Sequence, residues 1–74
     1  MESEVLFLDG ITLGQRVRVA RFLAGWRQVD LAETAGVTQN DVSQLERDVP
    51  VYSAARRRIL EALGLADPFE APHG

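Results

Sequence analysis

The sequence contains no cysteine and no lysine, and its single histidine, His73, stands next to the C-terminus. Without cysteine, the chain cannot form disulfides, thiolate zinc sites or cysteine nucleophiles. One histidine in the tail excludes both a metal site of several imidazoles and a Ser-His-Asp triad. The sequence also lacks a glycine loop that could cradle phosphate. We therefore do not expect an enzyme, a cofactor, a metal or a small-molecule substrate.

Long apolar runs are also missing. The longest, Val5–Leu8, is far too short to span a bilayer. The first residues, Met1–Glu4, are acidic and do not resemble a signal peptide. These features predict a cytoplasmic protein with no membrane partner.

Positive charge is scarce in total but concentrated in the middle of the chain. The 74 residues carry a formal net charge of −3, which as a whole-chain number argues against a nucleic-acid partner. All eight arginines nevertheless lie within residues 13–63, where six carboxylates leave a net charge of +2. Residues 1–12 carry −3 and residues 64–74 carry −2. A chain this short forms one small domain, with a mildly basic middle and two acidic ends.

The first predicted helix begins after Thr12. Thr12 and Gln15 fit a capping box, and Gly25 is the expected end of this helix. Its inner face is apolar at helical spacing and consists of Leu13, Val17, Ala20 and Ala24.

Two short helices follow, one over residues 28–35 and one over residues 39–47. Gly36 is expected to end the former in a left-handed conformation, and Thr38 is a good N-cap for the latter. The residues expected to face inward are Leu31, Ala32 and Ala35 in the former and Val42, Leu45 and Glu46 in the latter. Asp48 and Pro50 end the second of these helices.

A fourth helix is predicted over residues 54–63, with Ser53 as its cap and the triplet 56–58 of arginines on its outside. Residues 66–74 contain two prolines and a glycine, which predicts an irregular or disordered tail. At the other end, Val5–Leu8 and the turn signal at residues 9–10 predict a short strand or an extended arm. The chain therefore divides into an arm (1–11), an all-α domain of four to five helices (12–65) and a tail (66–74).

The segment of residues 28–47 resembles the helix-turn-helix of the phage repressor and Cro-like family, also called the xenobiotic-response-element type. It reads Gln-Val-Asp-Leu-Ala-Glu-Thr-Ala-Gly-Val-Thr-Gln-Asn-Asp-Val-Ser-Gln-Leu-Glu-Arg. Residues 13–21 and 59–65 resemble the first and fourth helices of the family, so the resemblance covers about residues 13–65. It implies a compact repressor-like fold and a transcriptional regulator, bacterial or encoded by a phage, that binds DNA sequence-specifically.

The resemblance also implies a site. In the family, the residue at position 28 contacts a phosphate or a flanking base, and residues at positions 39, 40 and 44 reach base edges in the major groove. Glutamine and asparagine can donate and accept together, which suits N6 and N7 of adenine. Two arginines occupy flanking positions suited to phosphates. The DNA-binding residues so predicted are Arg27, Gln28, Thr38, Gln39, Asn40, Ser43, Gln44 and Arg47.

Other positions are expected to be structural. The resemblance implies an ion pair between Arg21 and Glu46 that joins the first and third helices. We expect Trp26 to pack in the core and Tyr52 to pack in the loop or on the fourth helix.

Three features depart from the family. The loop at residues 48–52 has no positive charge, although the family's loop is often basic. Asp41 lies on the predicted recognition helix, where it would repel phosphate. The fifth helix, often used for dimerisation, is missing or replaced by the tail. We expect Val5–Leu8 to take over its role, either by covering the core or by forming a homodimer contact.

Two functions remain open at this point. One is a regulator that binds a double-stranded DNA operator as a homodimer, with half-sites about one helical turn apart. The alternative is a protein-interaction module, such as an antitoxin or a phage protein that binds another regulator. The acidic ends of the chain favour this alternative.

Overall fold

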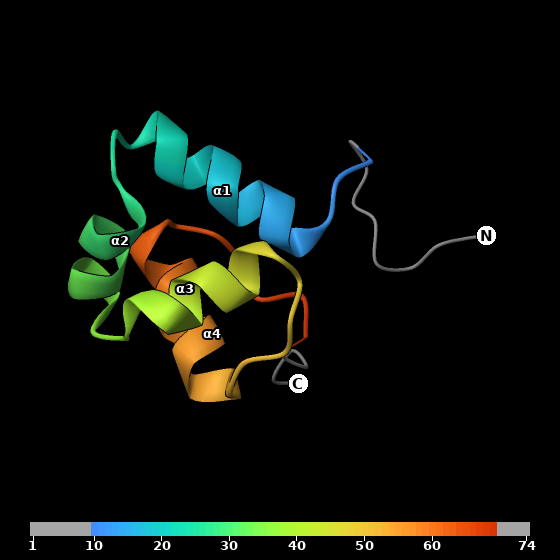
Figure 1. The fold of residues 1–74 in the computed structure, drawn as a ribbon. Helices are drawn as coiled ribbons and strands as arrows, with labels where there is room; N and C mark the ends of the chain where they lie inside the picture. Colours follow the sequence, from blue (N-terminus) through green and yellow to red (C-terminus); the bar gives the residue numbers. More distant parts are fainter. Residues whose placement is uncertain (1–9, 70–74) are drawn as a thin grey trace.

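The computed structural model describes residues 10–69, which form a compact domain of four helices without a strand (Figure 1). The helices are α1 (Leu13–Leu23), α2 (Gln28–Ala35), α3 (Gln39–Glu46) and α4 (Ser53–Ala62). The all-α prediction is therefore confirmed. The predicted arm at Val5–Leu8 lies outside the described residues.

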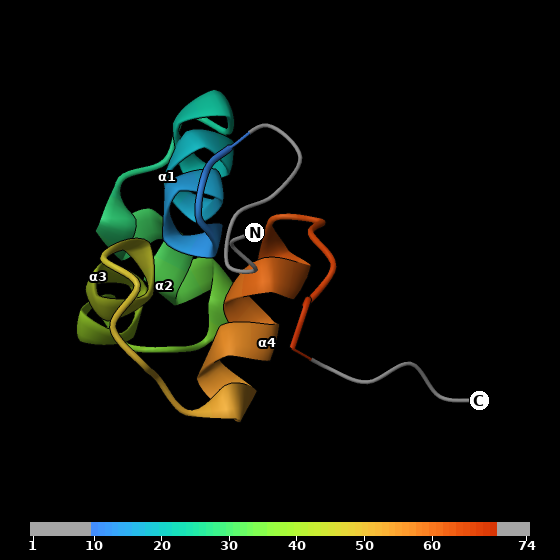
Figure 2. The same ribbon diagram turned by 90° about the vertical axis from the view of Figure 1, so that its right-hand side faces the viewer.

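The third helix is the centre of the packing. α3 contacts each of the other three helices, and α2 also contacts α4. In Figure 1, α1 lies across the top of the domain, and α4 lies behind α3. In Figure 2, α3 and α4 lie on opposite sides of the view below α1, with α2 visible between them. Because α3 is held by neighbours on several sides, only part of its circumference can face a partner.

Helix α1 begins after Thr12, as predicted, and its last residue is Leu23, two residues before the predicted Gly25. The Thr12 hydroxyl accepts from the Gln15 N–H at 3.1 Å, and the Gln15 side chain accepts from the Thr12 N–H at 2.9 Å. Gly25 follows the helix with a φ of 76°, a conformation that favours glycine. The prediction that Ala24 faces the core is wrong. Ala24 is the C-cap residue and keeps a helical conformation, with its N–H donating to the Ala20 carbonyl. It is exposed because the buried residues of α1 all lie in its first half and its last turn extends beyond the core.

Helices α2 and α3 are joined by the turn at residues 36–38. Gly36 has a φ of 75° and its N–H donates to the Ala32 carbonyl at 2.9 Å. The Thr38 hydroxyl then caps α3 by accepting from the Asp41 N–H at 3.0 Å. These features confirm the predicted turn residues, and α3 ends one residue before the predicted boundary.

Two predictions for the region of α4 are wrong. Ser53 is the first residue of α4 and not its cap, since Tyr52 takes the N-cap position without a capping hydrogen bond. Arg56 does not lie on the outside, because its side chain is only 17% exposed and pairs with Asp67, with Nε 2.9 Å from Oδ2. This ion pair holds the beginning of the tail against α4. Residues 66–69 form neither a helix nor a strand, and this ion pair fixes where they lie.

The hydrophobic core draws residues from all four helices. Its largest fully buried side chains are Val17, Leu31, Val42, Ile59 and Leu60. Trp26 is half-buried and packs against this core, as predicted. Burial of each such aliphatic side chain stabilises a domain by roughly 1.5–3 kcal/mol. In the described part of the chain, no helix is long and apolar enough to cross a membrane.

Candidate nucleic-acid interface

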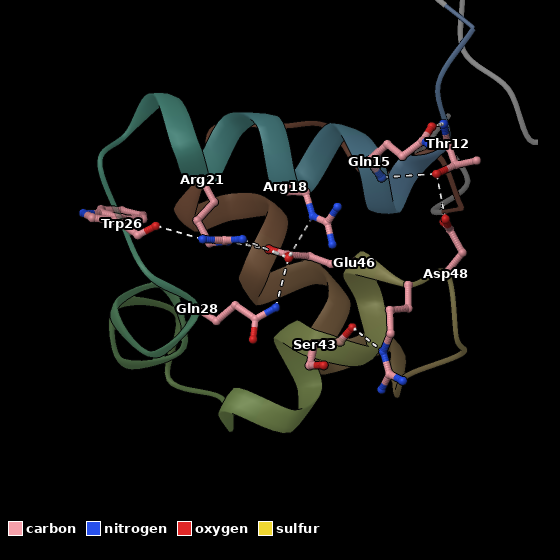
Figure 3. Close-up of polar contacts among 10 residues, drawn as sticks. Thr12, Gln15, Arg18, Arg21, Trp26, Gln28, Ser43, Glu46 and Asp48 are labelled. Carbon is pink, nitrogen blue, oxygen red and sulfur yellow. Dashed lines mark hydrogen bonds and ion pairs between the residues drawn. The ribbon is translucent and has the colours of Figure 1, made fainter.

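A buried carboxylate fixes the inner side of α3 (Figure 3). The side chain of Glu46, in the last turn of α3, is 1% exposed. Arg21 on α1 donates to both oxygens of this carboxylate. Its Nε lies 2.6 Å from Oε2, and its Nη2 lies 3.1 Å from Oε1. A charge-assisted pair of this bidentate kind is short and directional. The ion pair implied by the resemblance is therefore present.

Further donors complete the environment of this carboxylate. Gln28 Nε2 donates to Glu46 Oε1 at 3.0 Å, and Arg18 Nε lies 3.8 Å from the same oxygen. Arg21 also donates to the carbonyl oxygen of Trp26 at 3.0 Å, which ties down the chain between α1 and α2. A buried charge is tolerated when it is paired and hydrogen-bonded in this way. The network fixes α3 relative to α1 and to the start of α2.

Gln28 has a structural role in this network. Its side chain is drawn pointing from the start of α2 toward Glu46, and the residue is half-buried (Figure 3). The amide nitrogen donates to Glu46, whereas the carbonyl oxygen remains the end that could accept from a partner. The sequence placed Gln28 only among the DNA contacts, because its link to Glu46 spans 18 residues and has no local signal.

The outer side of α3 carries the polar residues. Gln39 and Asn40 are exposed, and Ser43 and Gln44 are half-buried. Val42, Leu45 and Glu46 are buried, as predicted. Helical spacing places Asn40, Ser43, Gln44 and the following Arg47 on one face. The structure thus gathers five of the eight predicted residues, Gln39, Asn40, Ser43, Gln44 and Arg47, on one exposed surface.

Thr38 and Asp41 are occupied by capping at the start of α3. The Asp41 carboxylate accepts from the Thr38 N–H at 3.1 Å, which completes a capping box. Asp41 therefore stabilises the start of α3. Its negative charge still lies in the first turn of α3, where it opposes binding of a phosphate.

Arg27 is similarly engaged at the start of α2. Its guanidinium donates to both carboxylate oxygens of Asp30 at 3.0 Å, and its backbone N–H donates to Oδ2 at 2.8 Å. The hydrogen bonds from Arg27 lower the pKa of Asp30, and the same contact raises the pKa of Arg27. Arg27 is exposed, but a carboxylate compensates much of its charge.

Arg47 is the C-cap residue of α3 and, unlike Arg27, is not paired with a carboxylate among the described residues. Its Nε donates to the Ser43 carbonyl at 3.3 Å, and the residue is exposed. This single backbone contact leaves its charge without a carboxylate partner among the described residues. Arg47 is thus well placed to contact a phosphate beside α3.

Tyr52 belongs to the same surface, contrary to the prediction that it packs. Its side chain is 85% exposed, and it borders a hollow together with Asn40, Asp41, Gln44, Pro50 and Val51. A tyrosine hydroxyl is one of the groups that contact phosphates in protein–DNA complexes. The sequence did not indicate this, because Tyr52 lies eight positions after Gln44 and meets it only through the loop that follows α3.

No family model matches the chain, and no curated protein matches it. Within residues 10–69, no group of three or more histidines or carboxylates is placed to hold a metal ion. Among the described residues, the candidate site is the amide-rich outer face of α3, flanked by the exposed side chains of Arg47 and Tyr52.

Proposed function

We propose that this protein is a sequence-specific DNA-binding transcriptional regulator of the helix-turn-helix class, repressor- or Cro-like. In this proposal α2 and α3 form the helix-turn-helix, and α3 enters the major groove. The observation that supports it best is the division of α3 into two sides. Glu46 fixes the inner side to α1 and α2, and the outer side presents amide groups to solvent.

The dimensions of α3 suit this role. A helix with its side chains is about 10–12 Å in diameter, and the major groove is about 12 Å wide. Gln39 and Asn40 lie in the first turn, the part of a recognition helix that commonly reaches base edges. Gln44 lies one turn further along the same side. We assign base-edge contacts to these three amides and a supporting contact to Ser43.

Phosphate contacts are few in this proposal. Arg47 and Tyr52 flank the amide face, and Arg27 contributes the part of its charge that Asp30 does not compensate. Both Asp30 and Asp41 occupy first-turn positions, where a helix N-terminus would otherwise favour an anion. We therefore propose a regulator in which electrostatic attraction contributes little to DNA affinity and in which α3 determines sequence specificity.

The proposed partner is a double-stranded operator. Because an eight-residue helix reads only a few base pairs, we propose that two copies bind a two-fold symmetric operator as a homodimer. Bacterial or phage origin and a cytoplasmic site of action belong to the same proposal. They rest on the resemblance of residues 28–47 to the repressor and Cro-like family.

A second candidate function is protein recognition by the same surface. The observation that favours it is the pair of first-turn carboxylates, Asp30 and Asp41, together with an exposed aromatic ring at Tyr52. Interface centres are enriched in tyrosine, and carboxylates do not oppose a protein partner as they oppose phosphate. An antitoxin, or a phage protein that binds another regulator, would use the surface in this way.

Selection from random duplex oligonucleotides distinguishes the two functions. The full chain is expected to enrich one motif. Gln39→Ala and Gln44→Ala are each expected to lose base preference at a few positions and to retain non-specific binding. Thr34→Ala, at an exposed position of α2, is the matched control and is expected to retain the motif. Failure of the folded wild-type chain to enrich any motif would contradict DNA reading and favour the protein-binding function.

A further inference from the structure

An apolar strip lies on the outer face of α1. Val19, Phe22 and Leu23 are 49%, 73% and 84% exposed, respectively. Their spacing of three and four residues places them together on one helix face, opposite the buried Leu13 and Val17. We call these three residues the α1 strip. A contiguous apolar patch of this kind marks an interaction surface more often than a scattered exposed residue does.

The charges around the α1 strip limit what can cover it. Helix α1 contains three arginines and no acidic residue. The side chain of Arg18 is 59% exposed, and the Arg21 guanidinium lies 5.7 Å from the centroid of the Phe22 ring. Arg21 is neutralised by Glu46, but two copies that met strip to strip would bring their exposed Arg18 side chains close together, which disfavours that contact. A suitable occupant is apolar and carries acidic residues at its ends.

The first nine residues of this chain have that character. They carry Glu2, Glu4 and Asp9, no basic residue, and the apolar run Val5–Leu8. These residues lie outside the described part of the chain, and they connect directly to the start of α1. Their apolar run matches the strip, and their carboxylates match the exposed Arg18 beside it.

The length of the segment before α1, if extended, matches the distance along α1 to the α1 strip. Gly10 has a φ of 83° and lies in a bend, which allows the preceding residues to run back along α1. At about 3.3 Å per extended residue, Leu8 would lie about 10 Å and Leu6 about 17 Å from Ile11. At 1.5 Å per helical residue, Val19 and Leu23 lie roughly 9 and 15 Å from the start of α1 at Leu13.

We propose that Val5–Leu8 of the same chain docks on the α1 strip. Attachment through a short linker gives the segment an effective concentration on the order of millimolar, which favours the same chain over a second copy. An apolar hollow near the start of α1 is lined by Leu13, Val49 and Phe69. Arg56 in its wall is already paired with Asp67, whereas Asp48 adds a carboxylate to the wall. That carboxylate would repel the acidic ends of the segment.

Paramagnetic relaxation tests the position of the segment. Because the sequence has no cysteine, Ser3→Cys provides a single attachment point for a nitroxide on the full chain. We expect broadening of the amide signals of residues 19–23 and none at residues 57–59 of α4. Broadening confined to residues 49–51 and 69, or absent from the described residues, would overturn the proposal.

A mixed sample tests which copy provides the segment. Spin-labelled chains without isotope are mixed with isotope-labelled chains that carry no nitroxide. We expect no broadening of residues 19–23 in this sample. Broadening there would show that the segment comes from a second copy, which would overturn docking within one chain.

Substitutions test the energetic link between the two segments. Phe7→Ser and Leu23→Ser are each expected to lower the Tm by about 5 °C, and the double variant by no more than one of them. Tyr52→Ala, at a position as exposed as Leu23, is the control and is expected to leave the Tm unchanged, since neither tyrosine nor alanine caps the start of α4. Full additivity, or an unchanged Tm in both single variants, would refute the proposed contact.

Discussion

The backbone of Gly14 lies directly against the carbonyl of Glu46, where α1 crosses the end of α3. A Cβ atom at position 14 would come within 2.6 Å of the carbonyl oxygens of Glu46 and Leu45, a distance that real Cβ atoms do not adopt. The obstructing atoms belong to the backbone and cannot rotate away. This close approach brings α1 near enough for Arg21 to reach Glu46.

We therefore expect Gly14→Ala to destabilise the domain. Alanine is the better helix former by about 1 kcal/mol, but overpacking against a fixed backbone costs about 1–3 kcal/mol. The free energy of unfolding in urea should consequently fall. Thr34→Ala, at an exposed helix position, should leave it equal or higher. A Gly14→Ala variant more stable than wild type would show that the two helices do not approach so closely.

The buried ion pair predicts strong coupling between α1 and α3. Arg21→Met or Glu46→Leu alone leaves a buried charge without its partner and should cost about 3–5 kcal/mol, enough to unfold much of a domain this small. The double variant Arg21→Met/Glu46→Leu replaces the pair with apolar groups and should recover part of the loss. Urea denaturation of all three variants measures this coupling, with the exposed Arg58→Met as control. Additive losses in the double variant would contradict it.

Asp48 caps α1 from the loop after α3. It accepts from the Thr12 hydroxyl at 2.6 Å and from the Gly14 N–H at 2.9 Å, and it has a φ of 61°. Asp48→Ala removes these acceptors and puts alanine in the left-handed region, so we expect a loss of about 1–2 kcal/mol in urea denaturation. Asp48→Asn keeps an acceptor and tolerates this φ, so its loss should be smaller. Equal losses for the two variants would argue against the cap.

The sequence predicted the helices because their signals are local. The capping box of Thr12 and Gln15 spans three residues, and Gly36 ends its helix within the pattern itself. The pairing of Arg21 with Glu46, by contrast, was implied only by the resemblance to a family. Composition alone does not indicate which of eight arginines meets which carboxylate.

The contacts that the sequence missed join residues far apart in the chain. Asp48 reaches Thr12 across 36 residues, and Arg56 meets Asp67 across 11. Such pairs depend on the angles at which helices cross and on the path of the loops. The exposed position of Tyr52 was missed for the same reason. Its place beside Gln44 depends on the path of the loop after α3, which the sequence does not indicate.

The contact between Arg27 and Asp30 predicts a dependence of stability on pH. Hydrogen bonds from Arg27 lower the pKa of Asp30 in the folded state. The stabilisation is therefore present above the pKa of Asp30 in the unfolded chain and is lost as the pH falls through its folded pKa. Asp30→Asn should have a lower Tm than wild type at pH 7 but an equal Tm once the pH is below the folded pKa. Thermal unfolding across this range measures the effect, with the exposed Glu61→Gln as control. A difference that persists in strong acid would exclude ionisation of Asp30 as its cause.

The salt dependence of DNA binding separates phosphate contacts from base contacts at the proposed interface. Arg47 lies beside the amide face with one backbone contact, so Arg47→Gln should weaken binding to all sequences alike. The slope of log Kobs against log salt should become less steep by about 1 per bound protomer. Gln44→Ala should leave this slope unchanged and relax base preference. Because few cations face the proposed site, the wild-type slope should itself be shallow. A slope as steep as about −8 would contradict the proposed division of roles, since it would require many more phosphate contacts than this surface provides.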